Sequence, residues 1–281
     1  MQEFLSNLFK NFFIDYFFYI WYHTHEVKML LEEFDDNKIA VLNASNIVKK
    51  NNNMPKTIVS FFEHKLFDMF LEKFKPEQIS EIGCAVKIHP IYKVNFEGNE
   101  IAVIQAGIGE PYCVSNFEEI IELGVENILL FGSCGSLIPL NACSVIVPYA
   151  ALRDEGTSFH YAPPSDEIEL DSTLVKNLCN FFASKGIKYE LGKTWTTDAF
   201  YRETPKKVEN RKKMGAICVE MECAGMTAMC KFRNVNFATF FYTGDSLATG
   251  EWDKGSLSHL KLEGKDILVP LAFEAANTIF N

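Results

Sequence analysis

Apolar and polar positions along the chain follow two periods, one typical of strands and one typical of helices. The expected strands are 57–60, 91–96, 101–105, 127–131, 144–151, 188–194 and 237–243. The expected helices are 61–74, 113–123, 172–185, 218–231 and 265–280. Because strands alternate with helices and several strands are apolar on both faces, the pattern predicts a single-domain α/β fold with a mixed, largely parallel sheet flanked by helices.

The N-terminal part of the chain lacks this regularity. Its polar end, Lys49–Asn53, separates an expected extension over 1–53 from one domain over 54–281. Aromatic and aliphatic residues crowd positions 4–22, yet the longest unbroken apolar run is Tyr16–Tyr22, too short for a membrane span or secretory signal. We expect residues 1–28 either to pack on the body or a partner subunit, or to lie outside a functional chain that starts at Met29.

Composition excludes several classes of function. The chain has 27 Lys and Arg against 37 Asp and Glu, a net charge of -10, and its basic residues form no patch, so nucleic acid is not an expected partner. Its 8 cysteines show no paired metal-ligand spacing and lie mostly in apolar runs. We therefore expect free thiols, no metal site, no membrane association and a reducing, cytoplasmic location.

Candidate chemistry lies where expected strands end in loops. The glycine-bearing turn Gly132–Gly135 can offer backbone N–H groups and a serine hydroxyl to an oxyanion. The carboxylates of Glu220–Glu222 suit a sugar diol, although a solvated helix N-terminus is the alternative. Asp245 follows a buried strand, which makes it either a general acid or a turn-forming residue. Gly107–Gly109 is a weak signal, because close backbone packing explains most such pairs.

Taken together, these motifs resemble those of one family, the nucleoside phosphorylases of the hexameric purine nucleoside phosphorylase and uridine phosphorylase type. In chain order the motifs are Gly107-Ile108-Gly109, Gly132-Ser133-Cys134-Gly135, Thr197-Asp198-Ala199-Phe200-Tyr201, Val219-Glu220-Met221-Glu222 and Thr243-Gly244-Asp245. The resemblance runs from about Ile88 to Ala248. It implies the three-layer fold of that phosphorylase/hydrolase-like group, and phosphate-dependent cleavage of a nucleoside to free base and ribose 1-phosphate. Inorganic phosphate is the implied co-substrate, with no cofactor.

The resemblance also implies residue roles. The implied catalytic residues are Glu222, which binds the ribose hydroxyls, and Asp245, which protonates the imidazole nitrogen of a purine. Phe200 stacks on the base and Met221 packs under the sugar. The implied substrate-binding set is Phe200, Tyr201, Glu220, Met221 and Glu222, and the implied phosphate-binding set is Gly132, Ser133, Cys134 and Lys87.

Two features favour a purine base and one favours uridine. Only 21 residues separate Phe200 from Glu222, a spacing that matches the purine branch, and Asp245 stands where purine enzymes keep their acid. The segment Leu152–Pro163 looks most like the uridine branch. Lys87 takes the place of an arginine that reaches a neighbouring subunit's site, which implies a homo-oligomer, a dimer or a trimer of dimers.

The sequence departs from the family at the phosphate site. Leu130 replaces the arginine that usually precedes the glycine-serine turn, and Ser60–Lys65 replaces an early glycine-arginine loop. Three alternatives to a purine nucleoside phosphorylase therefore stay open. They are a uridine phosphorylase, a hydrolytic nucleosidase with Glu63 as its base, and a non-catalytic nucleoside-binding protein.

Overall fold

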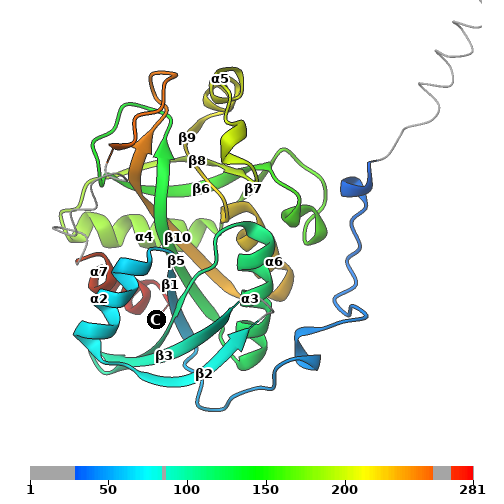
Figure 1. Cartoon of the computed structure of the whole chain (residues 1–281), viewed down its shortest axis with the longest axis vertical. Coiled ribbons are helices and arrows are strands. Elements are labelled where there is room, and N and C mark those ends of the chain that lie inside the picture. The colour runs from blue at the N-terminus through cyan, green and yellow to red at the C-terminus, as the bar shows by residue number, and fades with distance from the viewer. Residues whose placement is uncertain (1–28, 84–86, 256–266, 281) are drawn as a thin grey trace, which may run out of the picture.

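One mixed sheet organises the chain, which the computed structural model describes over residues 29–83, 87–255 and 267–280 (Figure 1). Its strands are β1 (Thr57–Phe61), β2 (Glu77–Gly83), β3 (Ile88–Phe96), β4 (Asn99–Gln105), β5 (Asn127–Ser136), β6 (Val145–Asp154), β7 (Glu167–Glu169), β8 (Tyr189–Thr197), β9 (Ala216–Glu220) and β10 (Asn236–Ser246). The α-helices are α2 (His64–Phe74), α3 (Glu110–Leu123), α4 (Ser172–Ser184), α5 (Pro205–Lys213), α6 (Cys223–Arg233) and α7 (Leu268–Ile279). Short 3-10 turns are η1 (Leu30–Glu32), η2 (Ala44–Asn46), η3 (Thr157–His160) and η4 (Phe200–Arg202).

Part of the sheet closes on itself. The strand order is β10-β6-β8-β9-β5-β1-β4-β3-β2, with β7 paired to β6, and β10 also pairs with β5. The strands β5, β9, β8, β6 and β10 therefore form a ring, from which β1, β4, β3 and β2 extend as an open sheet. Among the described strands five pairs are parallel and five antiparallel, which confirms the expected mixed α/β sheet. The strands expected over 91–96 and 101–105 are β3 and β4, which pair antiparallel as a hairpin.

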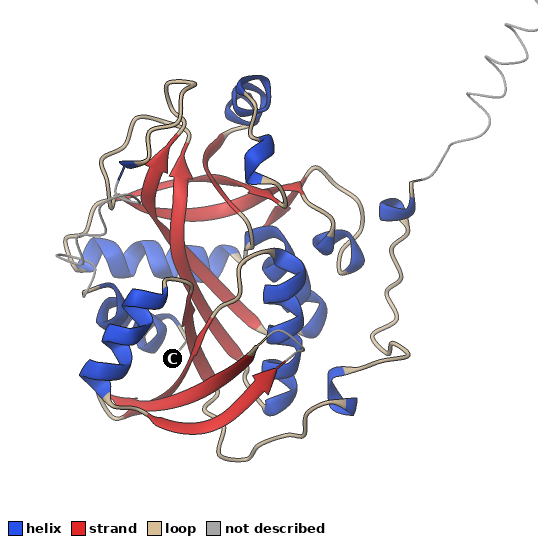
Figure 2. Cartoon of the chain, in the orientation of Figure 1, coloured by secondary structure: helices blue, strands red, loops and turns tan. Residues whose placement is uncertain are grey.

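Helices cover both faces of the sheet, giving three layers (Figure 2). On one face α2, α4 and α7 enclose an aromatic core, in which Phe131 stacks between Phe61 and Phe240 at ring-centroid distances of 5.0 and 5.2 Å. On the other face α3 and α6 pack on apolar residues of β1, β4 and β5. Burial of these rings and aliphatic chains on both faces is the main stabilising contribution to the fold.

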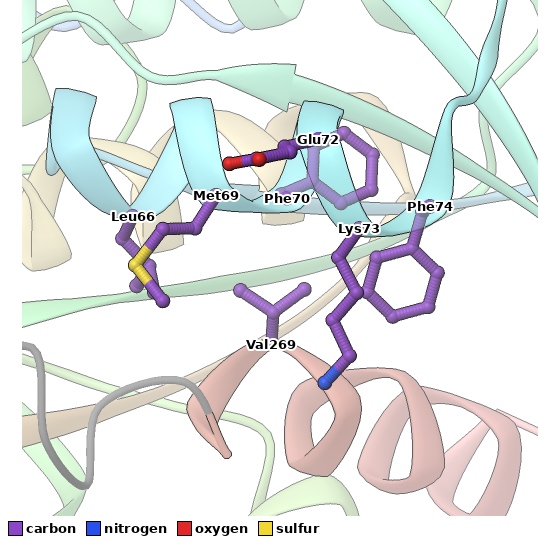
Figure 3. Close-up of a pocket in the computed structure, with 7 residues that line it drawn as sticks. All are labelled: Leu66, Met69, Phe70, Glu72, Lys73, Phe74 and Val269. Atoms are coloured by element: carbon purple, nitrogen blue, oxygen red, sulfur yellow. The ribbon is translucent and has the colours of Figure 1, made fainter.

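The contact between α2 and α7 leaves a shallow cavity of about 280 Å³ (Figure 3). The rings of Phe70 and Phe74 pack edge-on against Phe273 of α7, at 6.1 and 5.5 Å. Beside them, Val269 of α7 faces the aliphatic part of Lys73 (Figure 3). None of the residues expected to bind substrate lines this cavity.

The described part of the extension, residues 29–53, runs along the outside of α3 and α6 (blue in Figure 1). Arg233 Nη1 donates to the carbonyl of Lys38 at 2.9 Å, and the Asn51 N–H donates to the carbonyl of Leu123 at 3.0 Å. The prediction for residues 1–28 lies outside the described residues. No described helix has the length and apolar character that crossing a bilayer requires.

The expected helix over 218–231 is wrong at its start. Ala216–Glu220 is strand β9, which pairs parallel with β8 and antiparallel with β5, and α6 begins only at Cys223. An apolar run this short is compatible with either structure, and here pairing within the sheet decided. Phe61 likewise ends β1, paired with Gln105, instead of starting α2. The strands β2 and β7 and the polar helix α5 had no clear periodic signal.

Candidate active site

A cavity of about 530 Å³ opens where β5, β9 and β10 end. Its lining consists of Ser133, Cys134, Gly135, Phe200, Tyr201, Glu203, Val219, Glu220, Met221, Asp245, Leu247 and Trp252. Ligand sites of α/β sheets lie at such strand ends, and the volume is in the usual range for a small-molecule site. The tertiary structure thus gathers strand ends that lie more than a hundred residues apart in the chain, such as Ser133 and Asp245.

The glycine turn expected over Gly132–Gly135 is wrong, because these residues belong to strand β5 and pair in parallel with β10. A Cβ on Gly132 would lie 2.7 Å from the ring of Phe62, and a Cβ on Gly135 would lie 2.9 Å from Leu247 Cδ1. Both side chains therefore pack directly on the backbone of the strand. Gly132 is covered by Phe62, whereas Ser133 is exposed and lines the cavity. The hydroxyl of Ser133 is accordingly the polar group that the end of β5 presents to a ligand.

Glu220 connects β9 to β8 and to the N-terminus of α6 through hydrogen bonds. Its Oε1 accepts hydrogen bonds from the hydroxyls of Thr194 (3.1 Å) and Thr196 (2.6 Å) on β8. Its Oε2 accepts from the N–H groups of Glu222 and Cys223, both at 2.7 Å, at the N-terminus of α6. Four donors compensate the burial of this carboxyl and fix the position of the Met221 turn that lines the cavity.

Glu222 lies one residue beyond Met221 and faces the glycine loop before α3. Its Oε1 accepts the Gly109 N–H at 2.6 Å, and only 7% of the residue is exposed. Burial, together with the charge of Glu220, raises the pKa of Glu222 to about 8. Glu222 is not among the residues that line the cavity, although Met221 before it is. The sequence placed the glycine loop and the glutamate in one site, and this hydrogen bond joins them directly.

A second contact between α3 and α6 lies beside the first. The Gly225 N–H donates to Glu110 Oε1 at 2.5 Å, so the first turn of α6 is bound to the first turn of α3. Burial and the neighbouring Glu155 carboxyl raise the pKa of Glu110 well above its usual range. Burial thus favours the neutral form of Glu110, whose carboxyl joins the first turns of α3 and α6.

Beside the end of β5, the cavity combines carboxyl groups with aromatic rings. Trp252 Nε1 donates to Asp245 Oδ2 at 2.7 Å, and burial raises the pKa of Asp245. The pairing register between β10 and β5 shifts between Thr243 and Asp245. The rings of Phe200 and Tyr201 lie 4.2 Å apart at the rim. A flat, apolar ligand with polar edges fits this combination of ring faces and proton donors.

Cations are absent from the described lining of the cavity, which contains no Lys, Arg or His. Lys87 does not line the cavity; its Nζ lies 3.4 Å from Gln105 Oε1, and Gln105 Nε2 donates to the carbonyl of Phe62 at 3.0 Å. Arg153 is engaged by the loop after β6, where its Nε donates to Ser158 Oγ at 2.7 Å. Glu63 accepts from the hydroxyl of Tyr242 at 3.1 Å and does not line the cavity.

Most of the expected site residues meet at one cavity. Those that line it are Ser133, Cys134, Phe200, Tyr201, Glu220, Met221 and Asp245, whereas Gly132, Glu222 and Lys87 do not. Sequence reasoning missed Glu203, Leu247 and Trp252. A tryptophan in the loop after the Asp245 strand was a usable signal, since loops at strand ends carry function. Glu203 had no such signal, because it is one acid in a polar stretch.

Comparisons with known proteins agree on one family. The sequence model of the phosphorylase superfamily matches residues 61–267. A purine nucleoside phosphorylase of the DeoD type from Caldanaerobacter subterraneus is 29% identical over 183 residues, which cover 62% of this chain and 77% of the relative. A guanosine phosphorylase from Halorubrum lacusprofundi is 25% identical over 187 residues, which cover 66% of this chain and 77% of the relative.

Solved structures show the same fold. The purine nucleoside phosphorylase from Toxoplasma gondii in complex with immucillin-H superposes with a TM-score of 0.68 at 23% identity, covering 81% of this chain and 92% of that one. The uridine phosphorylase from Vibrio fischeri superposes with the same TM-score of 0.68 at 20% identity, covering 85% and 96%. Fold similarity therefore does not distinguish a purine from a pyrimidine substrate.

Proposed function

This chain belongs to the phosphorylase superfamily, and on that premise we propose that it is a nucleoside phosphorylase that cleaves a purine ribonucleoside with inorganic phosphate. The observation that carries the proposal is the cavity itself. It combines the Ser133 end of β5, the Glu220–Met221 wall, aromatic rings and Asp245 around one volume of about 530 Å³. These groups suit the phosphate, the sugar and the base of the proposed substrates. The products are the free base and ribose 1-phosphate, and no cofactor is required.

The sugar is proposed to lie over Met221, with its hydroxyls donating to Glu222. A carboxylate can accept from both hydroxyls of a diol at once. Glu222 is held next to the cavity wall by the Gly109 N–H, and the four donors on Glu220 fix the chain on its other side. Glu220 contributes to the wall beneath the nucleoside and positions Glu222. Bond cleavage builds positive charge on the ribose, which Glu222 stabilises in its ionised form, the form that predominates above its pKa of about 8.

The base is proposed to lie between the rings of Phe200 and Tyr201 and the carboxyl of Asp245. A departing purine carries negative charge into its imidazole ring, and a proton from a positioned acid lowers the cost of departure. Because burial raises the pKa of Asp245, this residue holds its proton closer to neutral pH than an exposed aspartate does. An acid at this position supports a purine, since a leaving uracil offers no imidazole nitrogen. Uridine remains the competing substrate.

Phosphate is proposed to bind at the end of β5, through the Ser133 hydroxyl. A cation is needed to balance its charge, and the described lining of this cavity supplies none. We propose that Lys87 completes the phosphate site of an adjacent copy of the chain, which makes the enzyme a homo-oligomer. The described cysteines are all free, which supports a reducing compartment such as the cytoplasm.

Hydrolysis is the second candidate, and a specific observation favours it. The cavity carries three carboxyl groups, from Glu203, Glu220 and Asp245, and no described cation. Phe62 covers Gly132, and the buried Leu130 offers no charge to the end of β5. An anion entering this cavity meets unfavourable electrostatics unless a partner subunit contributes charge. A neutral water molecule that acts as the nucleophile meets no such electrostatic barrier.

Phosphate dependence separates the two candidates. Inosine, adenosine and uridine are each incubated with the full chain, with and without phosphate, and both free base and ribose 1-phosphate are measured. We expect purine base to appear only with phosphate, in a 1:1 ratio with ribose 1-phosphate. Equal release in phosphate-free buffer, with free ribose as the product, would make the protein a nucleosidase. Binding of nucleosides without any release would make it a binding protein.

A further inference from the structure

Glu203 brings a second carboxyl group to the end of the cavity at which Asp245 lies. It stands between η4 and α5, where the backbone is fixed on both sides. The Glu203 N–H donates to the carbonyl of Phe200 at 3.2 Å, and the hydroxyl of Thr204 accepts the Lys207 N–H to cap α5. Its side chain lines the cavity next to the rings that are proposed to hold the base. Neither the motifs nor the proposed reaction uses it.

We propose that Glu203 recognises the substituent at C6 of the purine base and so determines which purine nucleosides are used. The inference rests on the proposed function, in which Asp245 meets N7. Purines carry N7 and the C6 substituent on the same edge, so a carboxyl beside Asp245 faces position 6. A neutral carboxyl donates to the 6-oxo group of inosine or guanosine, whereas a carboxylate accepts from the 6-amino group of adenosine.

The surroundings of Glu203 allow both forms near neutral pH. Burial, followed by the charge of Asp245, raises the pKa of Glu203 to about 7. The other titratable groups that line the cavity are Asp245 from β10, Glu220 from β9 and Tyr201 from η4. No described Lys, Arg or His in the lining holds Glu203 in its ionised form. Preference therefore shifts from 6-oxopurines at lower pH to 6-aminopurines at higher pH.

The test is the pH dependence of the ratio of kcat/KM for adenosine to kcat/KM for inosine. Both substrates share ribose, phosphate and Asp245, so those titrations cancel in the ratio. We expect the ratio to rise about 10-fold or more between pH 6 and pH 8, the scale of one hydrogen bond to a charged group. In Glu203→Gln, whose amide donates and accepts at every pH, the ratio is flat. Glu209→Gln on the exposed face of α5 is the matched control and keeps the rise.

Binding of free bases provides a readout that does not depend on turnover. Calorimetry in buffers of different ionisation enthalpy measures protons exchanged on binding. Hypoxanthine is expected to take up a proton at pH 8 and adenine to release one at pH 6, and Glu203→Gln loses both effects. A flat ratio in the wild type, or a slope or proton exchange that persists in Glu203→Gln, overturns the inference. If no purine nucleoside is cleaved, the proposed function fails, and the proton exchange on base binding alone decides the role of Glu203.

Discussion

Replacing Glu222 by glutamine is expected to stabilise the protein while it removes activity. In the folded chain this carboxyl is buried beside Glu220, and its pKa rises from 4.5 to about 8. The unfolded chain loses the proton near pH 4.5, so unfolding releases a proton at any pH between these values. Raising the pH over this window therefore favours unfolding. The stability associated with the protonated carboxyl is complete below pH 4.5 and lost once the pH passes about 8.

The size of the effect follows from the same shift. At about 1.4 kcal/mol per pH unit, it corresponds to up to about 5 kcal/mol of unfolding free energy between the two ends of the window. Glutamine has nearly the shape of the protonated acid and can still accept the Gly109 N–H through its oxygen. It has no charge to bury. The difference in unfolding free energy between Glu222→Gln and the wild type should be small at pH 5 and reach a few kcal/mol at pH 9.

Urea unfolding followed by tryptophan fluorescence from pH 5 to pH 9, at one protein concentration, measures this difference. Glu209→Gln, which replaces an exposed carboxyl on α5, is the control and should show no upward trend. Turnover of every nucleoside should fall alike in Glu222→Gln, because all of them share the ribose. A stability difference that stays constant with pH would refute the buried, protonated state of Glu222. Turnover that survives would refute its contact with the sugar.

Three further predictions concern the base, the helix contact and assembly. Asp245→Asn should lower kcat for purine nucleosides by about 10²-fold with little change in base affinity measured by calorimetry, and unchanged turnover would make the aspartate a turn former. A Cβ on Gly225 would lie 2.7 Å from the buried Cδ of Glu110. Gly225→Ala should therefore destabilise the chain by about 1–3 kcal/mol, measured as a lower Tm. An unchanged Tm would contradict this tight contact. Light scattering should give at least twice the 32.0 kDa of one chain, and a monomer that retains activity would remove Lys87 from the phosphate site.

The candidate site could be found from the sequence because its motifs are local. Apolar runs that lead into Gly132–Gly135 and Asp245 are visible in a short window. The structure continues β5 and β10 through these residues, where the sequence predicted loops. The cavity at the ends of β5 and β10 confirms that these strand ends lie together. The sequence could not show that Phe62 covers Gly132, since that contact depends on how the end of β1 lies beside β5.

The sequence by itself determined the alternation of strands and helices, and hence the layered α/β fold, because apolar periodicity records which faces of each element are buried. Tertiary structure decided features that depend on partners far along the chain. Ala216–Glu220 became a strand because β5 and β8 offered it backbone hydrogen bonds. Glu203 and Trp252 joined Asp245 because the sheet and its loops fold around one cavity. A carboxyl's pKa, and with it its chemistry, depends on such neighbours and on burial, and no short window of sequence contains them.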